Sequence, residues 1–138
     1  MARSTRITRL ESFSAAHRLF KAELSDEENF RLFGPCSNPG GHGHNYRLAV
    51  TVRGSIEPDS GMVLNLKTLH DLIQTSILDK VDHRNLNLEV DFLTGVQPTT
   101  ENLARAFFDE LEPRLPTGRL WRVLVQETDK NSAEYGED

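Results

Sequence analysis

The sequence predicts an α+β fold in which two helices cover one face of a four-stranded antiparallel sheet. Four segments of the 138-residue chain alternate apolar and polar residues, as strands do. Two other segments repeat apolar residues at three- and four-residue spacing, as helices do. Consecutive strand-like segments are also joined closely enough to pair antiparallel. We therefore expect a single domain over residues 1–138, which is long enough to bury a core.

Charge and cysteine content narrow the class of protein. The net charge of −5 argues against a general nucleic-acid-binding surface, although a local basic pocket can still hold a small anion. Cys36 is the only cysteine, so we expect no intramolecular disulfide, a reducing compartment and a free thiol. The first residues lack the apolar run of a signal peptide, and no run reaches the length of a membrane helix. These features predict a cytoplasmic protein without membrane or nucleic-acid partners.

The first strand is predicted over residues 3–18. Its mixed alternation suggests that one face is only partly buried, and that face would carry Ile7, Arg9, Glu11, Phe13 and Ala15. The strand ends in Phe13-Ser-Ala-Ala-His17, where small neighbours leave room for a metal beside the imidazole. His17 taken alone is more often a capped or exposed histidine.

Residues 21–33 are charged and polar, and they predict a loop with a short helical turn. Ser25 is the expected helix cap, with Glu28 as its capping-box partner. Gly34-Pro35 ends this turn just before Cys36. The expected apolar anchors of the segment are Leu24, Phe30 and Leu32.

The stretch Cys36-Ser-Asn-Pro-Gly-Gly-His42-Gly-His44-Asn-Tyr46 carries the strongest chemical signal. It leads into a second strand, predicted over residues 45–54. Residues i and i+2 at the start of a strand point to one face, so His42 and His44 can converge on one point. Two imidazoles supply two of the three ligands of a three-histidine metal site with an open fourth position. The alternative is a polar turn with two solvated histidines.

The turn Asp59-Ser-Gly61 leads to the first clear helix, predicted over residues 66–78. Asn65 is its expected cap. His70 lies off the apolar stripe and is expected to be solvated. The stripe itself consists of Leu66, Leu69, Leu72, Ile73 and Ile77.

A structured loop is predicted over residues 81–88. Within it, adjacent Asp82 and His83 offer an orienting carboxylate and an acid/base group, a pairing found in catalytic triads. The same dipeptide occurs more often in ordinary loops.

The second helix opens after Pro98, with Thr99 or Thr100 as cap, and its core-facing residues would include Phe107 and Leu111. A third strand over residues 120–127 and a short last strand over residues 132–135 complete the predicted sheet. Glu127 closes the third strand. A carboxylate there can accept two hydrogen bonds from a guanidine-like ring edge, whereas the alternative is a solvated strand-end glutamate.

Six short motifs, in one order, resemble the 6-pyruvoyl-tetrahydropterin synthase family, which also contains 6-carboxy-tetrahydropterin synthase. The resemblance runs from about residue 5 to residue 136. The joint pattern is specific, although no single motif is. The motifs are Phe-Ser-Ala-Ala-His17-Arg-Leu, Cys36-x5-His42-Gly-His44-Asn-Tyr, Gly-Met-Val-Leu-Asn-Leu, Asp82-His83-Arg-Asn-Leu-Asn, Thr99-Thr100-Glu101-Asn102 and Glu127-Thr-Asp.

The resemblance implies a tunnelling fold (T-fold), in which the sheets of a trimer close into a barrel and two trimers stack into a homo-hexamer. Barrel closure would remove exposed strand edges, and active sites would lie between subunits. The implied zinc ligands are His17, His42 and His44. The implied catalytic residues are Cys36, Asp82 and His83. Glu127 would anchor the 2-amino and N3 edge of the pterin, with help from Thr99, Thr100 and Glu101.

The implied activity is that of a zinc-dependent lyase of tetrahydrobiopterin biosynthesis. Zinc would acidify the side chain of 7,8-dihydroneopterin triphosphate, and the Cys36 thiolate would remove a proton. Asp82 would orient His83, which would relay protons. The products would be 6-pyruvoyl-tetrahydropterin and triphosphate, with no redox cofactor. Mg²⁺ is a further candidate beside the triphosphate. On charge alone, the candidates to hold the phosphates are Arg18, Arg47 and Lys67.

Three alternatives remain open. The 6-carboxy enzyme of queuosine biosynthesis uses the same substrate and releases acetaldehyde, but its cysteine usually lies closer to the His-Gly-His motif. Five residues separate Cys36 from His42 here, which favours the pyruvoyl enzyme. A branch with a carboxylate in place of the cysteine is disfavoured by Cys36 itself. A non-catalytic pterin- or purine-binding protein of the same fold would have no use for Cys36, Asp82 and His83.

Overall fold

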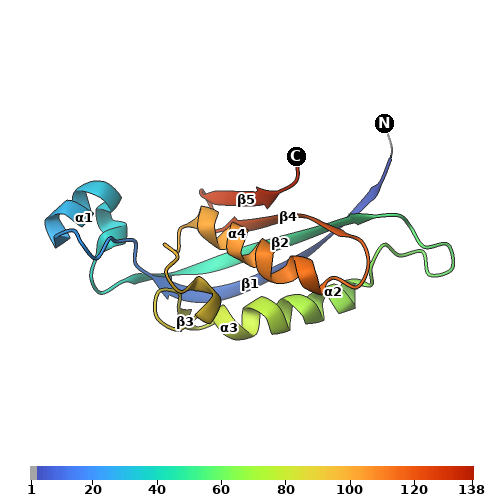
Figure 1. The fold of residues 1–138 in the computed structure, drawn as a ribbon, viewed down its shortest axis with the longest axis horizontal. Coiled ribbons are helices and arrows are strands. Elements are labelled where there is room, and N and C mark those ends of the chain that lie inside the picture. The colour runs from blue at the N-terminus through green and yellow to red at the C-terminus, as the bar shows by residue number, and fades with distance from the viewer. Residues whose placement is uncertain (1–2) are drawn as a thin grey trace.

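The computed structural model describes residues 3–138 and contains a five-stranded sheet with helices on one face (Figure 1). The sheet order is β3-β1-β2-β4-β5, and the pairs β1–β2, β2–β4 and β4–β5 are antiparallel, as predicted. The fifth strand corrects the prediction of a purely antiparallel, four-stranded sheet, because β3 pairs parallel with β1. The strands are β1 (Thr5–His17), β2 (His42–Gly54), β3 (Arg84–Asn85), β4 (Arg119–Gln126) and β5 (Ser132–Gly136).

Strands β1 and β2 pair along their whole lengths. Thr5 lies opposite Gly54 at one end, and His17 lies opposite His42 at the other. Strand β2 begins at His42 rather than near residue 45, so the His-Gly-His motif lies inside the paired strand. Side chains directly opposite each other in an antiparallel pair share a face, so the register alone places His17 and His42 on the same face.

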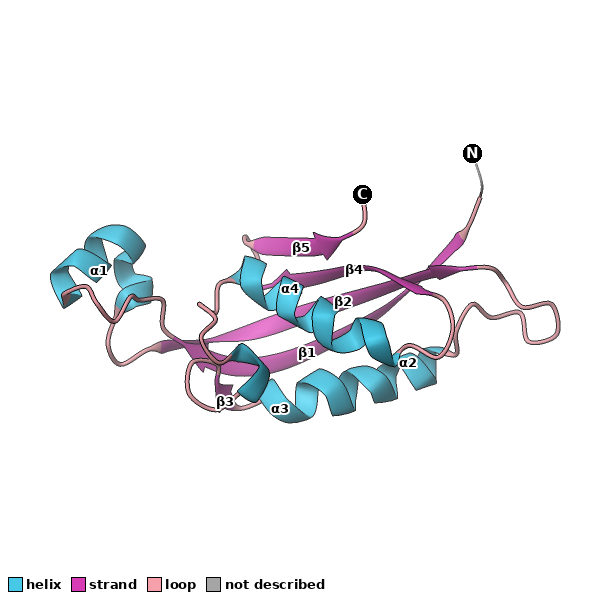
Figure 2. Ribbon diagram, viewed as in Figure 1, coloured by secondary structure: helices cyan, strands magenta, loops and turns pink. Residues whose placement is uncertain are grey.

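Helix α2 (Leu66–Ile73) runs through a π-helical turn (Gln74–Leu78) into α3 (Asp79–Val81), so the first predicted helix continues three residues beyond its expected end. Helix α4 (Thr100–Leu111) lies beside this run on the same face of the sheet (Figure 2). The predicted caps are confirmed: Asn65 accepts a hydrogen bond from the N–H of Lys67 at 2.8 Å, and Thr99 accepts one from Asn102 at 3.1 Å.

The core lies between the helices and the covered face of the sheet. Phe13 of β1 stacks on Tyr46 of β2 with ring centroids 4.7 Å apart, and it contacts the edge of Phe107 from α4 at 5.8 Å. The predicted stripe of α2 is buried in its central part, whereas Leu66 is 45% exposed because it lies at the start of the helix. The fully buried members of the stripe are Leu69, Ile73 and Ile77.

Helix α1 (Asp26–Phe33) and the 3₁₀ turn Gly34–Ser37 form a small lobe beyond the end of the sheet (Figure 1). The predicted capping box between Ser25 and Glu28 is confirmed, with both reciprocal hydrogen bonds at 3.1 Å. The prediction that Phe30 and Leu32 anchor this segment by burial is wrong, because these residues are 59% and 56% exposed. The buried residue of α1 is Asn29, at 1% exposure.

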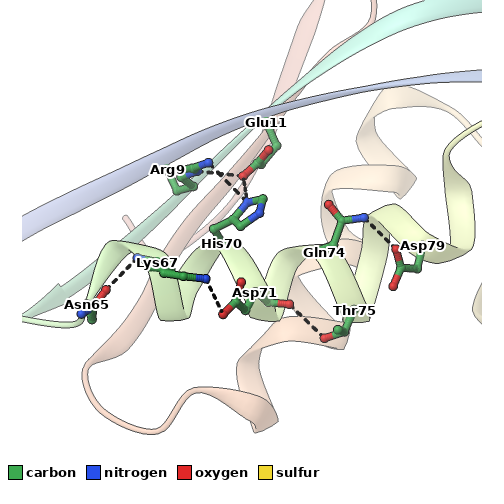
Figure 3. A network of polar contacts seen from close by, with 9 residues as sticks. All are labelled: Arg9, Glu11, Asn65, Lys67, His70, Asp71, Gln74, Thr75 and Asp79. Carbon is green, nitrogen blue, oxygen red and sulfur yellow. Dashed lines mark hydrogen bonds and ion pairs between the residues drawn. The ribbon is translucent and has the colours of Figure 1, made fainter.

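His70 is not the solvated residue that its position off the stripe predicts. Its Nδ1 donates a hydrogen bond to the carboxylate of Glu11, and Arg9 Nε donates to the same oxygen at 2.7 Å. Figure 3 shows His70 reaching from α2 toward this pair on β1. The inward face of β1 carries polar residues where α2 crosses it, and His70 supplies their partner.

Two further 3₁₀ turns lie at Asp91–Leu93 and Glu112–Arg114, and a hairpin loop joins β4 to β5. Within residues 3–138, every helix falls short of the length and apolar character needed to cross a bilayer.

Candidate metal and pterin site

Three histidines converge at the end of the β1–β2 pair. His17 is the last residue of β1, His42 is the first residue of β2, and His44 follows two positions later on the same face. One nitrogen from each ring can be chosen so that all three lie within 4.8 Å of one another. Gly41 has a positive φ of 73°, and an added Cβ there would lie 3.2 Å from the carbonyl oxygen of His17, so the chain needs glycine to enter β2 at this point.

Four buried ring nitrogens of this cluster form no hydrogen bond among the described residues, although one of them, Nε2 of His44, lies 3.2 Å from the Glu127 carboxylate. These buried atoms are Nε2 of His17, Nδ1 and Nε2 of His42, and Nε2 of His44. Buried polar atoms are normally paired, and three imidazoles aimed at one point are a ligand set that suits zinc and other transition metals. The residues therefore fit a bound metal ion.

His17 is oriented by a second contact. Its Nδ1 donates to the carbonyl oxygen of Pro98 at 2.8 Å, which leaves the lone pair of Nε2 directed toward the other two histidines. The hydroxyl of Tyr46 lies 3.4 Å from the same Nδ1. Burial lowers the pKa of His17, and burial likewise lowers the pKa of His44 against the opposing effect of Glu127. Both shifts favour the neutral rings that a metal requires.

Glu127 lies beside the histidines at the end of β4. Its Oε1 is 3.2 Å from Nε2 of His44, and its Oε2 accepts a hydrogen bond from the hydroxyl of Thr100 at 2.6 Å. The carboxylate is therefore held at the site by the first turn of α4. It is not the solvated strand-end residue of the alternative interpretation, since its side chain is only 15% exposed.

Cys36 lies in the 3₁₀ turn that follows α1, and its thiol is free and partly buried. Its carbonyl oxygen accepts a hydrogen bond from the N–H of Leu19 at 2.9 Å, so the turn packs against the segment that follows His17. The pKa of Tyr46 is raised first by burial and then by electrostatic interaction with Glu127 and Cys36. Both groups thus act on the phenol that lies beside His17.

Asp82 and His83 form a pair at the edge of the sheet next to β3. Asp82 Oδ1 lies 3.0 Å from His83 Nδ1, which is the orienting contact that the sequence predicts. The same oxygen accepts the N–H of Ser14 at 2.9 Å, and this hydrogen bond is the leading reason that the pKa of Asp82 is lowered. His83 has a left-handed backbone with φ of 60° and an 80% exposed side chain. Among the described residues, no hydrogen bond or ion pair joins it to the three histidines.

The remaining predicted residues have different surroundings. Thr99 caps α4, whereas Glu101 is exposed in its first turn. Arg47 is exposed on β2, and Lys67 pairs with Asp71 on the surface of α2. Arg18 is already engaged: its Nε donates to the carbonyl of Ser37 at 2.8 Å.

Sequence reasoning missed two groups of the site. Tyr46 is buried beside His17, and the alternation of β2 contains a signal for it, since it lies two positions after His44. The carbonyl of Pro98 had no such signal, because the contact joins positions 81 residues apart.

Comparison with known proteins places this geometry in context. The sequence profile described as "6-pyruvoyl tetrahydropterin synthase" matches residues 6–138. The human 6-pyruvoyl tetrahydrobiopterin synthase is 49% identical over 129 residues, covering 94% of this chain and 89% of that protein. The 6-carboxy-5,6,7,8-tetrahydropterin synthase of Bacillus subtilis is 34% identical over 109 residues, covering 74% and 70%. The structure of the Caenorhabditis elegans 6-pyruvoyl tetrahydropterin synthase superposes with a TM-score of 0.91 at 42% identity, covering 99% of this chain and 97% of that one.

Proposed function

The chain belongs to the 6-pyruvoyl tetrahydropterin synthase family, and on this premise we propose that it converts 7,8-dihydroneopterin triphosphate to 6-pyruvoyl-tetrahydropterin with elimination of triphosphate. The observation that carries this proposal is the cluster of three imidazoles with nitrogens within 4.8 Å of one another and the Glu127 carboxylate 3.2 Å from Nε2 of His44. A Lewis-acid centre and a pterin anchor are the two groups that such a reaction needs side by side. The whole chain would act as one domain of this family.

The metal would be held by His17, His42 and His44, and zinc is the ion that best suits three neutral imidazoles with one open position. Bound there, zinc would supply Lewis-acid polarisation of the side-chain oxygens of the substrate. A further Mg²⁺ ion would travel with the triphosphate rather than bind to a dedicated set of carboxylates.

The protein side chains would bind the pterin ring and take up the proton of the substrate side chain. Glu127 would accept hydrogen bonds from the 2-amino and N3 edge of the pterin, with one oxygen held by Thr100. The Cys36 thiolate would take a proton from the substrate side chain, and its position in a turn packed on the segment after His17 supports this role. Thr99 would act by fixing the start of α4, and Glu101 would contact the pterin only at the outer rim of the site.

Asp82 and His83 would act as an oriented acid/base pair. Asp82 holds Nδ1 of His83 at 3.0 Å, so that the other ring nitrogen is free to exchange protons with a bound substrate. The open position of His83 at the sheet edge supports a role across a subunit boundary, completing the site of a neighbouring copy.

We further propose that the chain assembles into trimers that stack into a hexamer. The outer edge of β1 pairs with β3 only at Ala15 and Ala16, and the outer edge of β5 pairs with no strand among the described residues. The sheet face away from the helices carries Leu10 at 70% exposure. Closure of several sheets into a barrel would satisfy these edges and cover this face. The lone cysteine, which must stay reduced, fits a cytoplasmic setting.

Mass spectrometry of the products tests the reaction. Zinc-loaded protein is incubated with 7,8-dihydroneopterin triphosphate without sulfite, which can trap unsaturated pterins, and chelator-treated protein serves as the control. Formation of 6-pyruvoyl-tetrahydropterin and triphosphate is expected. Formation of 6-carboxy-tetrahydropterin and acetaldehyde would move the chain to the queuosine-type branch. Pterin binding without turnover would make it a binding protein.

The 6-carboxy activity is the second candidate because a relative of that name is 34% identical. The higher identity of 49% to the human pyruvoyl enzyme, and the five residues between Cys36 and His42, favour the pyruvoyl activity.

A further inference from the structure

Residues 18–21, which follow His17, have no strand partner, yet side-chain amides bind their backbone. Asn87 accepts a hydrogen bond from the N–H of Arg18 at 2.7 Å and donates one to the carbonyl of the same residue at 2.9 Å. Gln97 forms the same pair of bonds with Phe20, at 3.3 Å and 2.8 Å. Each amide thus pairs with one residue as a neighbouring strand would.

A third amide completes the set. Asn29 accepts the N–H of Lys21 at 2.8 Å and donates to its carbonyl at 3.0 Å. Asn29 is the buried residue of α1, with 1% of its surface exposed. Because Phe30 and Leu32 of the same helix are exposed whereas this polar side chain is buried, its hydrogen bonds contribute to holding α1 to the rest of the chain.

Only a primary amide can make this pair of contacts in the same space. An amide carries both a donor and an acceptor, whereas an ionised carboxylate of the same shape only accepts. Asn→Asp and Gln→Glu substitutions therefore keep the shape and remove the bond to the backbone carbonyl. They also bring a negative charge to that carbonyl.

The three amides come from three segments that each carry another group of the candidate site. Asn87 follows the loop of Asp82 and His83, and Gln97 precedes the residue whose carbonyl binds His17. Asn29 lies in α1, directly before the turn that contains Cys36.

The turn that contains Cys36 is also hydrogen-bonded to residues 18–21. Leu19 N–H donates to the carbonyl of Cys36 at 2.9 Å, and Arg18 Nε donates to that of Ser37 at 2.8 Å. The guanidinium of Arg18 lies 4.0 Å from the centre of the Phe20 ring, which keeps it folded against the segment. Displacing residues 18–21 would therefore displace the thiol relative to His17.

We propose that Asn29, Asn87 and Gln97 are positioning residues that set the place of Cys36 relative to the three-histidine metal site. This inference rests on the proposed function, in which the thiol takes a proton beside the metal. A displacement of about 1 Å at a reacting group can lower turnover about a hundredfold, so kcat should respond more strongly than KM.

The test compares Gln97→Glu and Asn87→Asp with Gln74→Glu. Gln74 makes a hydrogen bond to Asp79 at 2.7 Å on the surface of the helical run, so its variant applies the same chemical change away from residues 18–21. Three quantities are measured for each protein: bound zinc per chain, kcat and KM, and the rate of iodoacetamide alkylation of Cys36 with and without zinc. Cys36 is the only cysteine, so the alkylation signal comes from one site.

Zinc should accelerate alkylation of Cys36 several-fold in the native protein, because a nearby cation stabilises the thiolate. In Gln97→Glu and Asn87→Asp, bound zinc should remain near one per chain, the acceleration should disappear, and kcat should fall about ten- to a hundredfold with a smaller change in KM. Gln74→Glu should match the native protein in all three measurements.

Two results would overturn the inference: no effect of zinc on alkylation in the native protein, or an undiminished effect together with native kcat in both variants. Failure of the proposed function appears differently. In that case the native protein would not turn over the pterin, while the comparison of zinc-dependent alkylation between native protein and variants would still decide whether the amides position Cys36.

Discussion

The carboxylate of Glu127 lies 3.2 Å from Nε2 of His44, so the candidate pterin anchor and a candidate metal ligand are direct neighbours. Glu127 directly follows β4 and His44 lies near the start of β2, so their contact lies at the end of this antiparallel pair of strands. A substrate held by Glu127 would consequently meet the metal within a few bond lengths. Three substitutions separate what the parts of this arrangement contribute, and a fourth tests a partly buried carboxylate away from the site.

Replacing His42 should remove the metal. His42→Ala leaves two of the three imidazoles, and a site with two protein ligands holds zinc much more weakly. Elemental analysis after gel filtration should show bound zinc falling from about one per chain to near zero. His70→Ala is the control, since His70 lies on α2 and contacts Glu11 instead. Full zinc occupancy in His42→Ala would mean that the three histidines are not the metal site.

Replacing Cys36 should separate binding from turnover. Cys36→Ala removes the proposed base but none of the metal ligands or the pterin anchor, so the dissociation constant for a pterin should stay within about twofold. Turnover should fall about a hundred- to ten-thousandfold, the usual contribution of a positioned proton acceptor. Fluorescence titration and single-turnover kinetics measure the two quantities. Native turnover in this variant would exclude Cys36 as the base.

Replacing Glu127 should weaken pterin binding. Glu127→Gln loses the ionised acceptor that would pair with the 2-amino and N3 edge, and a hydrogen bond to a charged group contributes about 1.5–3 kcal/mol. The dissociation constant should therefore rise about ten- to a hundredfold. Glu112→Gln, at an exposed residue after α4, provides the same chemical change as a control. Isothermal titration with a pterin ligand would refute the anchor role if both variants bound equally well.

Glu11 should make stability depend on pH. Burial raises its pKa, but hydrogen bonds from His70 and Arg9 outweigh burial, and the net pKa is lower than the ordinary value of 4.5. A lowered folded-state pKa gives stability that is present above pH 4.5 and is lost as the pH falls through the folded-state value. Glu11→Gln should thus lower the free energy of unfolding by about 1 kcal/mol at pH 7.

Urea unfolding at pH 7, 5 and 4 measures this effect, and the difference between Glu11→Gln and the native protein should shrink at pH 4. Asp71→Asn is the matched control, because Asp71 pairs with Lys67 on the exposed side of α2, the helix that carries His70 (Figure 3). Its loss should change stability by less than about 0.5 kcal/mol. A difference for Glu11→Gln that is constant over this pH range would contradict the assignment.

Local signals were predictable from the sequence because their causes lie within a few residues. The caps at Asn65 and Thr99 and the capping box at Ser25 involve contacts across two or three positions. The convergence of His42 and His44 follows in the same way from strand geometry. The position of His17 opposite His42 depends on the pairing of two strands, so the small neighbours of His17 made it only one candidate ligand, and the resemblance to a family was needed to join it to the other two.

The failures concern polar residues whose partners are distant in sequence. His70 was expected in solvent because its helix alone cannot reveal Glu11, which is 59 positions away. Phe30 and Leu32 were expected inside because apolar residues usually are, yet α1 is attached through Asn29. The parallel pairing of β3 with β1 involves two residues and has no periodic signal that a sequence could display.

The long connection between β1 and β2 has a consequence for how the sheet reaches its correct alignment. A tight hairpin fixes strand register through its turn, but residues 18–41 separate these two strands and no such turn exists. A slip of one residue would send the alternating side chains of β2 to the opposite face, and His42 and His44 would leave His17. Only the native alignment assembles all three imidazoles. A metal ion bound to them would therefore stabilise the correct register of the two longest strands over the slipped ones.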